Sequence, residues 1–269
     1  GLIERIKMPL TPLSLISTFV AALLTFRSNQ GLARLHEGRL AFGQVVLHTR
    51  EMALLVAAYI YPKDPFVGLQ MVRHLSLFGW TLKGHVRKSD QDDIIHTMLP
   101  DSRDAVFVTS QRKKPVAVLA KLRQCTAYML QRGLLAVPQH NMLERTTADL
   151  NNVIMRCERI QATPIPPIYT AHTSRLLMFY LVFLPLALNG ALNGMATVLL
   201  TMVVGYAMLG LDEISHLLEE PFRLMPLYQL SKISMADVAD ALVVQPPPIN
   251  DGRNLTQSIT NNDNPPAYW

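Results

Sequence analysis

The longest apolar stretch of the sequence runs from Leu176 to Leu211 and contains no Asp, Glu, Lys or Arg over 36 residues. One continuous helix of that length would measure about 54 Å, whereas the hydrocarbon core of a bilayer is about 30 Å thick. The stretch therefore predicts two membrane passes, Leu176–Leu188 and Met195–Leu211. Because Asn and Gly favour turns, the break is expected at Asn189-Gly190 or at Asn193-Gly194.

A second uncharged stretch, Met8–Phe26, is 19 residues long, which is enough for one more pass. It is less apolar, because prolines and hydroxyl residues such as Pro12, Ser14 and Thr18 interrupt it. Polar side chains inside a spanning helix usually face protein or water rather than lipid. The residues alone leave two interpretations open: close packing of helices through small side chains, or a helix that lines a pore.

Composition and charge agree with a membrane protein that carries a polar part. The chain is 49% hydrophobic and 17% charged, against about 25% charged in ordinary soluble domains. Residues 27–175 hold 20 basic and 11 acidic side chains, whereas residues 212–269 hold 3 basic and 8 acidic ones. The positive-inside rule therefore places the 27–175 segment on the cytoplasmic or stromal side. A net charge of +5 is too small to indicate nucleic-acid binding.

These patterns predict an all-α membrane protein with five parts. They are a membrane helix in residues 1–26, a helical cytosolic or stromal domain in 27–174, a transmembrane hairpin in 175–211, a helical return segment in 212–244, and a disordered or wrapping tail in 245–269. We expect no enzyme, because the phosphate-binding glycine motifs, the zinc motif H-E-x-x-H and the nucleophile motif G-x-S-x-G are all missing from the sequence. We likewise expect no cofactor and no metal site, because the sequence has only two cysteines and no pair of histidines four residues apart.

Three phrases in order resemble the bestrophin family, in particular its plant and algal members described as voltage-dependent chloride channels. The first is Phe26-Arg-Ser-Asn-Gln30 followed by Arg34-Leu-His-Glu-Gly-Arg39. The second is Ile165-Pro-Pro-Ile-Tyr-Thr-Ala-His-Thr-Ser-Arg175, and the third is Gly210-Leu-Asp-Glu-Ile214 with Glu219-Glu-Pro-Phe222. The resemblance covers roughly residues 9–242. It implies a homopentamer of helical subunits around a central pore, with the family's first membrane helix preceding Gly1.

The resemblance also implies positions for the pore. The narrow neck of the family matches Met8–Phe26, and aligning Asn29 with the family's asparagine places Leu10, Ser14 and Thr18 on the axis. A register shifted by one residue would instead place Leu13 and Ser17 there. Hydroxyls at Ser14 and Thr18 would ease wetting and offer donors to an anion, unless both bond back to carbonyls of their own helix.

Charged residues below this neck receive expected roles in the same way. Arg27 and Arg34 are expected to attract anions into the vestibule, whereas Arg39 is expected to form an ion pair between helices. Asp212 and Glu213 are expected to lie at a helix end or in salt bridges. A second constriction is expected near Val137. The acidic run that binds calcium in animal bestrophins is missing after Pro221-Phe222, so we expect no gating by calcium.

The resemblance implies a passive channel for chloride and other monovalent anions, including bicarbonate, in the thylakoid membrane of a chloroplast. Its partners would be the lipid bilayer, four further copies of the chain and other membrane proteins, and not nucleic acid. Two alternatives remain open: a monovalent cation channel of the same fold, and a non-conducting subunit that scaffolds a photosynthetic assembly.

Overall fold

The structure, a computed structural model, describes residues 10–243 and the side chains of residues 11–243. Its dominant element is α1 (Leu10–Tyr59), a single helix of 50 residues that is about 75 Å long at 1.5 Å per residue. The helix passes residue 26 without a break, so the expected membrane helix and the start of the expected polar domain form one rod. The side chain of Leu10 and the tail expected in residues 245–269 lie outside the described residues.

The expected hairpin is present, and its helices extend beyond the apolar stretch at their outer ends. It consists of α7 (Pro167–Leu188) and α8 (Gly194–Glu219), joined by the turn at residues 189–193. The Asn-Gly pair at 189–190 lies at the start of this turn, and the pair at 193–194 lies at its end. The turn thus runs between the two positions at which a break was expected. Within residues 10–243 three helices, α1, α7 and α8, are long and apolar enough to cross a membrane.

The remaining helices gather around the second half of α1. Among the described residues they are α2 (Pro65–Arg87), α3 (Asp92–Met98), α4 (Ser102–Ser110), α5 (Lys114–Gln131), α6 (Val137–Ala162), α9 (Pro221–Leu224) and α10 (Leu227–Val243). Local chemistry sets several of the starts. For example, Pro65 opens α2, and the carboxylate of Asp64 accepts from the backbone N–H groups of Phe66 and Val67 at 3.1 Å.

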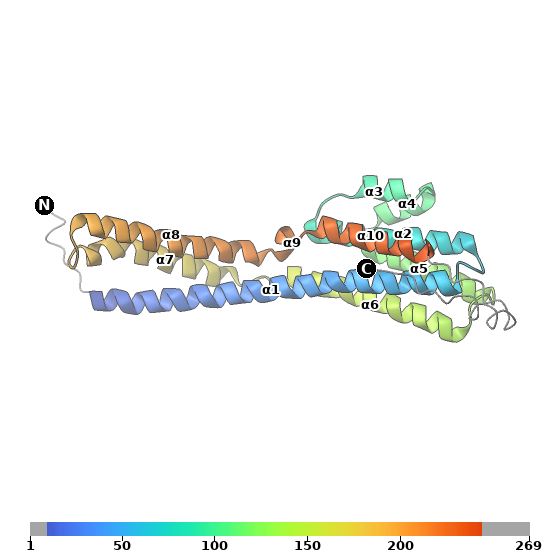
Figure 1. Ribbon diagram of the computed structural model, residues 1–269, viewed down its shortest axis with the longest axis horizontal. Helices are drawn as coiled ribbons and strands as arrows, with labels where there is room; N and C mark the ends of the chain where they lie inside the picture. The colour runs from blue at the N-terminus through green and yellow to red at the C-terminus, as the bar shows by residue number, and fades with distance from the viewer. Residues whose placement is uncertain (1–9, 244–269) are drawn as a thin grey trace, which may run out of the picture.

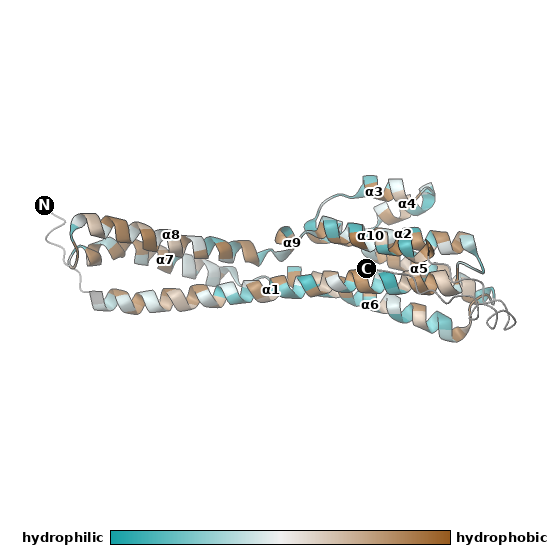
Figure 2. Ribbon diagram, viewed as in Figure 1, coloured by the Kyte–Doolittle hydropathy of each residue, from teal (hydrophilic) through white to brown (hydrophobic). Residues whose placement is uncertain are grey.

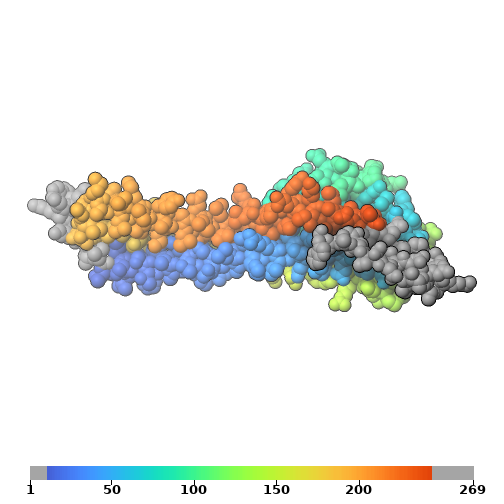
Figure 3. Space-filling view, viewed as in Figure 1, coloured from blue at the N-terminus to red at the C-terminus, as the bar shows by residue number. Residues whose placement is uncertain are grey.

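The molecule is elongated, with a narrow half and a wide half (Figures 1 and 3). The hairpin half consists of α7, α8 and the first half of α1; Figure 2 colours most of α8 as hydrophobic, and many apolar side chains of this half are exposed. The bundle half consists of α2 to α6, α10 and the second half of α1. The short α9 lies at the joint between the two halves (Figure 1).

Each half has a hydrophobic core of its own. In the hairpin half, side chains of α1 pack against α7, with Val20, Leu24 and Leu177 at its centre. The larger core fills the bundle half around residues such as Phe42, Phe78 and Leu122, all at most 1% exposed. In contrast, α8 exposes most of its apolar side chains, among them Leu199 at 65% and Met202 at 66%. A surface of this kind is stable only against lipid or other protein.

Candidate functional site

The first half of α1 has two distinct faces. One face is buried against the hairpin, and its residues recur at helical spacing along one stripe: Leu13, Val20, Leu24, Arg27 and Gly31. The opposite face is exposed and follows an i, i+4 ladder of Ser14, Thr18, Ala22 and Phe26. Steps of four residues drift by only about 40° around a helix. Over its three steps the ladder therefore drifts by about 120° around α1; all four residues are exposed, and at Phe26 the ladder reaches Tyr169 of α7.

The two hydroxyls of this ladder bond back to their own helix. Ser14 Oγ donates to the carbonyl of Thr11 at 2.8 Å, and Thr18 Oγ1 donates to the carbonyl of Ser14 at 3.1 Å. Each proton is therefore used within the helix, which is the alternative left open for these residues. What the exposed ladder presents at these positions is hydroxyl oxygen and methyl groups, not free O–H donors.

Ala22 and Phe26 extend the ladder beyond the residues expected from the sequence. The Phe26 side chain is 54% exposed, and its ring meets the edge of Tyr169 of α7 at a centroid distance of 5.8 Å. Tyr169 in turn donates its hydroxyl to the carbonyl of Leu23 at 3.1 Å. The sequence already indicated Ala22 and Phe26, because the i+4 spacing of Leu10, Ser14 and Thr18 continues through these two positions.

Arg27 is fully buried, and this corrects its expected role. Its Nη1 lies 2.7 Å from Asp212 Oδ1, and its Nε donates to Glu219 Oε1 at 2.9 Å. Both partners belong to α8, so the guanidinium ties α1 to the hairpin. A charge with no exposed surface and two carboxylate partners contributes no free positive potential to a vestibule.

Hydroxyl groups complete the network around this ion pair. Ser174 donates to Asp212 at 3.3 Å, and Thr170 donates to Glu219 Oε1 at 3.2 Å. One turn along, the hydroxyls of Ser28 and Ser215 lie 2.6 Å apart. The hydroxyls of Ser174 and Thr170 thus satisfy the two carboxylates, whereas Arg27 Nη2 is buried without a hydrogen bond and is compensated by charge alone, 2.9 Å from Glu219 Oε1.

The other charged residues singled out from the sequence lie in three different settings. Arg34 is half-buried and binds the carbonyls of Thr163 and, at 2.7 Å, Ile160, so it joins α1 to the end of α6. Arg39 and Glu213 are exposed and form no ion pair within residues 10–243. The helix-to-helix ion pair expected of Arg39 is therefore made by Arg27, with Asp212 as its acid.

Val137 is the first residue of α6 and is 61% exposed. The loop just before Val137 is held against the segment that follows α1, because Lys63 Nζ donates a hydrogen bond to the carbonyl of Leu134 at 2.7 Å. The start of α6 thus lies at the end of the bundle half that is away from the hairpin (Figure 1). The side chain is available to face a neighbour or a water-filled space.

The segment after the hairpin is built from apolar and basic groups. Pro221 and Phe222 are buried, and Arg223 pairs with Glu220 at 2.9 Å. Within the described residues no group of three or more His, Cys, Asp or Glu side chains is arranged to hold a metal ion.

The bundle half contains a buried polar cluster between α2, α4 and α5. Lys121 Nζ lies 2.8 Å from Asp104 Oδ1, and Gln70 Nε2 donates to Asp104 Oδ2 at 2.8 Å. Burial alone would raise the pKa of Asp104, but these hydrogen bonds outweigh it and lower the pKa below its usual value. Burial lowers the pKa of neighbouring His74, whose Nε2 is 3.6 Å from Asp104 Oδ2. The cluster thus holds α4 on the bundle with Asp104 charged and His74 neutral.

A long helix, an apolar hairpin and a helical bundle joined by buried charges define a helical integral membrane protein. The family described as Bacterial/Fungal Bestrophin protein matches residues 2–240. The chain belongs to the bestrophin family, as the three sequence phrases indicated.

Named relatives and solved structures agree with this assignment. The voltage-dependent anion channel-forming protein RSc3414 of Ralstonia nicotianae is 28% identical over 81% of this chain and 71% of its own length. The voltage-dependent chloride channel 1, chloroplastic, of Arabidopsis thaliana is 25% identical over 90% of this chain and 58% of its own length. A crystal structure of a bacterial bestrophin homologue from Klebsiella pneumoniae superposes with a TM-score of 0.84 at 24% identity, over 88% of this chain and 89% of that one. The all-helical bestrophin fold is thereby confirmed.

Proposed function

We propose that the chain is one subunit of a homopentameric channel that conducts chloride, and also bicarbonate, passively across a membrane. The observation that carries this proposal is the exposed ladder Ser14, Thr18, Ala22 and Phe26 on a helix whose other face is packed against an apolar hairpin. Hydroxyl side chains such as Ser14 and Thr18 on a spanning helix are best placed toward water or protein. The printed names of the Ralstonia and Arabidopsis relatives, an anion channel-forming protein and a chloride channel, support the choice of ion.

In this proposal five copies of α1 surround the axis, and the ladder with Leu10 above it forms the neck. Rings of hydroxyl oxygen and methyl groups at Ser14 and Thr18 make the upper neck wettable, although they supply no free donors. The ring of Phe26 side chains would be its narrow apolar part, where conduction depends on wetting. Val137 forms the second constriction at the far end of the pathway.

Anion preference then arises from the electrostatics of the mouth and not from the neck. Arg34 binds backbone carbonyls and forms no ion pair within the described residues, although Glu219 and Glu37 act on it at longer range, so of the two arginines it is the better candidate for drawing anions into the vestibule. The excess of basic residues over residues 27–175 acts in the same direction.

The membrane in which the channel acts is proposed to be the thylakoid membrane. This location is supported by the chloroplastic relative alone, whereas the family description names bacteria and fungi. Fractionation of the source cells with an antibody to the chain tests it, and recovery in any other membrane would overturn the location without affecting the channel.

Reconstitution of the purified protein in a planar bilayer with a chloride gradient tests the function. The proposal predicts a reversal potential close to that of chloride, and a loss of conductance in the double variant Ser14→Phe with Thr18→Phe. The exposed pair Leu199→Phe with Met202→Phe on α8 is the matched control and should conduct normally. A reversal potential near that of potassium would favour the cation channel, and a purified pentamer without currents would favour the scaffold.

A further inference from the structure

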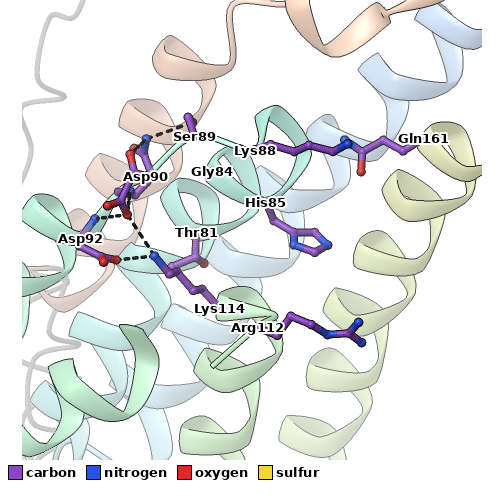
Figure 4. Close-up of a pocket in the computed structure, with 11 residues that line it drawn as sticks. Thr81, Gly84, His85, Lys88, Ser89, Asp90, Asp92, Arg112, Lys114 and Gln161 are labelled. Atoms are coloured by element: carbon purple, nitrogen blue, oxygen red, sulfur yellow. Dashed lines mark hydrogen bonds and ion pairs between the residues drawn. The ribbon is translucent and has the colours of Figure 1, made fainter. Parts of the chain in front are cut away.

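Two adjoining hollows lie beside the loop that follows α2, near the joint of the two halves. The first has a volume of about 520 Å³ and is lined by residues of α2, α6 and the start of α5. The second has a volume of about 740 Å³ and extends toward α1 and α9. They share Lys88, Ser89 and Gln161. Figure 4 shows the first hollow, with Lys88, His85 and Arg112 all projecting toward α6.

Positive charge predominates in this cleft. Its cationic lining residues are Arg34, Arg87, Lys88, Arg112, Lys114 and Arg223, against the acidic Asp90, Asp92, Glu219 and Glu220. Several of these charges compensate one another, since Lys114 pairs with Asp90 and Asp92, and Arg223 pairs with Glu220. Lys88 and Arg112 form no ion pair with any acid of residues 10–243. Two cations therefore face the same space with their charge uncompensated by the described part of the chain.

The backbone at Lys88 gives an independent indication that its side chain has a role. Lys88 has φ 52° and ψ 36°, which is the left-handed conformation that normally falls to glycine at the end of a helix. Among residues 10–243, Lys88 is the only residue other than a glycine that has a positive φ. Residues kept in such a conformation tend to occur where the side chain binds or reacts. A glycine here would fit without strain but would bring no charge to the cleft.

Ser89 follows Lys88 in the chain and adds a hydroxyl group to the lining of both hollows. Its Oγ accepts a hydrogen bond from Gln91 Nε2 at 3.3 Å, which leaves its proton free to donate. An ammonium, a guanidinium and a hydroxyl are the donor set that fits a tetrahedral oxyanion with several acceptor oxygens. We propose that the cleft at Lys88, Ser89 and Arg112 binds an anion carrying a phosphate group.

The position of this cleft connects it to the segment after the hairpin. Arg87, the neighbour of Lys88, donates to the carbonyls of Phe222 at 3.0 Å and Met225 at 2.7 Å. A bound phosphate group would therefore lie beside the residues that fasten α2 to α9. The phosphate can come from a lipid headgroup or from a free solute, and both share the same chemistry.

Binding to the full chain, purified in detergent, tests the proposal without any need for currents. Inorganic phosphate is titrated and followed by calorimetry, and phosphatidate in nanodiscs is compared with phosphatidylcholine. The double variant Lys88→Gln with Arg112→Gln should lose affinity at least tenfold for whichever probe binds. The control Arg73→Gln with Lys232→Gln removes the same charge from exposed positions elsewhere and should stay within twofold of the wild type.

The single variant Lys88→Gly separates loss of the site from loss of the fold. It should raise the melting temperature, because glycine relieves the left-handed strain, and at the same time weaken phosphate binding. Saturation by inorganic phosphate alone identifies a free solute, and binding only to phosphatidate identifies a lipid headgroup. Absence of binding to both probes, or equal binding by the wild type and the Lys88 variants, would overturn the proposal.

Discussion

Arg27 Nη1 lies 2.7 Å from Asp212 Oδ1, although 185 residues of sequence separate the two side chains. The contact joins the helix that carries the exposed ladder to the second helix of the hairpin, and Glu219 adds a second carboxylate on the same arginine. The rotation of α1 about its axis, and with it the direction in which Thr18 and Phe26 point, is fixed by this network.

Removing the Arg27 charge should therefore destabilise the protein. Arg27→Gln leaves the partly buried Asp212 and Glu219 without their cation, at a cost of about 3 kcal/mol in the free energy of unfolding. Arg39→Gln removes an exposed arginine from the same helix and should change stability by no more than about 0.5 kcal/mol. Thermal unfolding of the two variants in detergent measures the difference, and equal melting temperatures would contradict the role given to Arg27.

Two glycines of α1 provide a second matched pair. A Cβ added at Gly31 would lie 2.6 Å from Leu218 Cβ of α8, so Gly31→Ala forces the helices apart and should cost about 1–3 kcal/mol. At Gly43 a Cβ meets nothing within 4 Å, and Gly43→Ala should stabilise the helix by about 0.5–1 kcal/mol. The melting temperature should fall in Gly31→Ala and rise in Gly43→Ala. A rise in both variants would show that α1 and α8 do not approach each other as closely at Gly31 as described.

The His74–Asp104 cluster predicts how stability depends on pH. Because burial lowers the pKa of His74, the stabilisation from its neutral form is complete above pH 6.5 and is lost as the pH falls toward the lowered value. The lowered pKa of Asp104 adds a second loss only when the pH falls below its usual value of 3.8. His74→Leu should flatten the decline of the melting temperature below pH 6.5, whereas His96→Leu, at an exposed position, should not. An unchanged slope in the His74 variant would contradict this assignment.

A charge placed at Val137 tests the second constriction. If five copies of this exposed side chain surround the pathway, Val137→Glu adds five negative charges and should reduce anion current and the anion-to-cation permeability ratio severalfold. Val137→Gln has the same size without the charge and should retain the ratio of the wild type. Reversal potentials in a chloride gradient separate the two, and identical ratios would place the constriction elsewhere.

Much of the fold was predictable because apolar patterning is local. The hairpin and its turn follow from an uncharged stretch too long for one pass, punctuated by Asn and Gly. The unbroken α1 was not foreseen, because charges from Arg27 onward were read as the start of a separate domain. The absence of proline between Pro12 and Pro62 is the signal that favours one continuous helix.

The charged residues could not be assigned from the sequence in the same way. A positive side chain after a membrane helix is equally consistent with a vestibule and with a buried ion pair, and the deciding partners of Arg27 lie nearly 200 positions away. The back-bonded hydroxyls of Ser14 and Thr18 depend on local rotamers, which a pattern of residues does not specify.

The central claim is that the exposed ladder of α1 faces a water-filled pore, and cysteine accessibility tests it most directly. The native Cys125 and Cys157 are buried, and burial raises the pKa of Cys125 to about 11 and that of Cys157 to about 12, so both are inert background thiols. A negatively charged thiosulfonate is applied to reconstituted wild type, Thr18→Cys and the α8 surface control Leu199→Cys. The account predicts a severalfold loss of current in Thr18→Cys alone. Unchanged current in Thr18→Cys, or block of Leu199→Cys in its place, would contradict it.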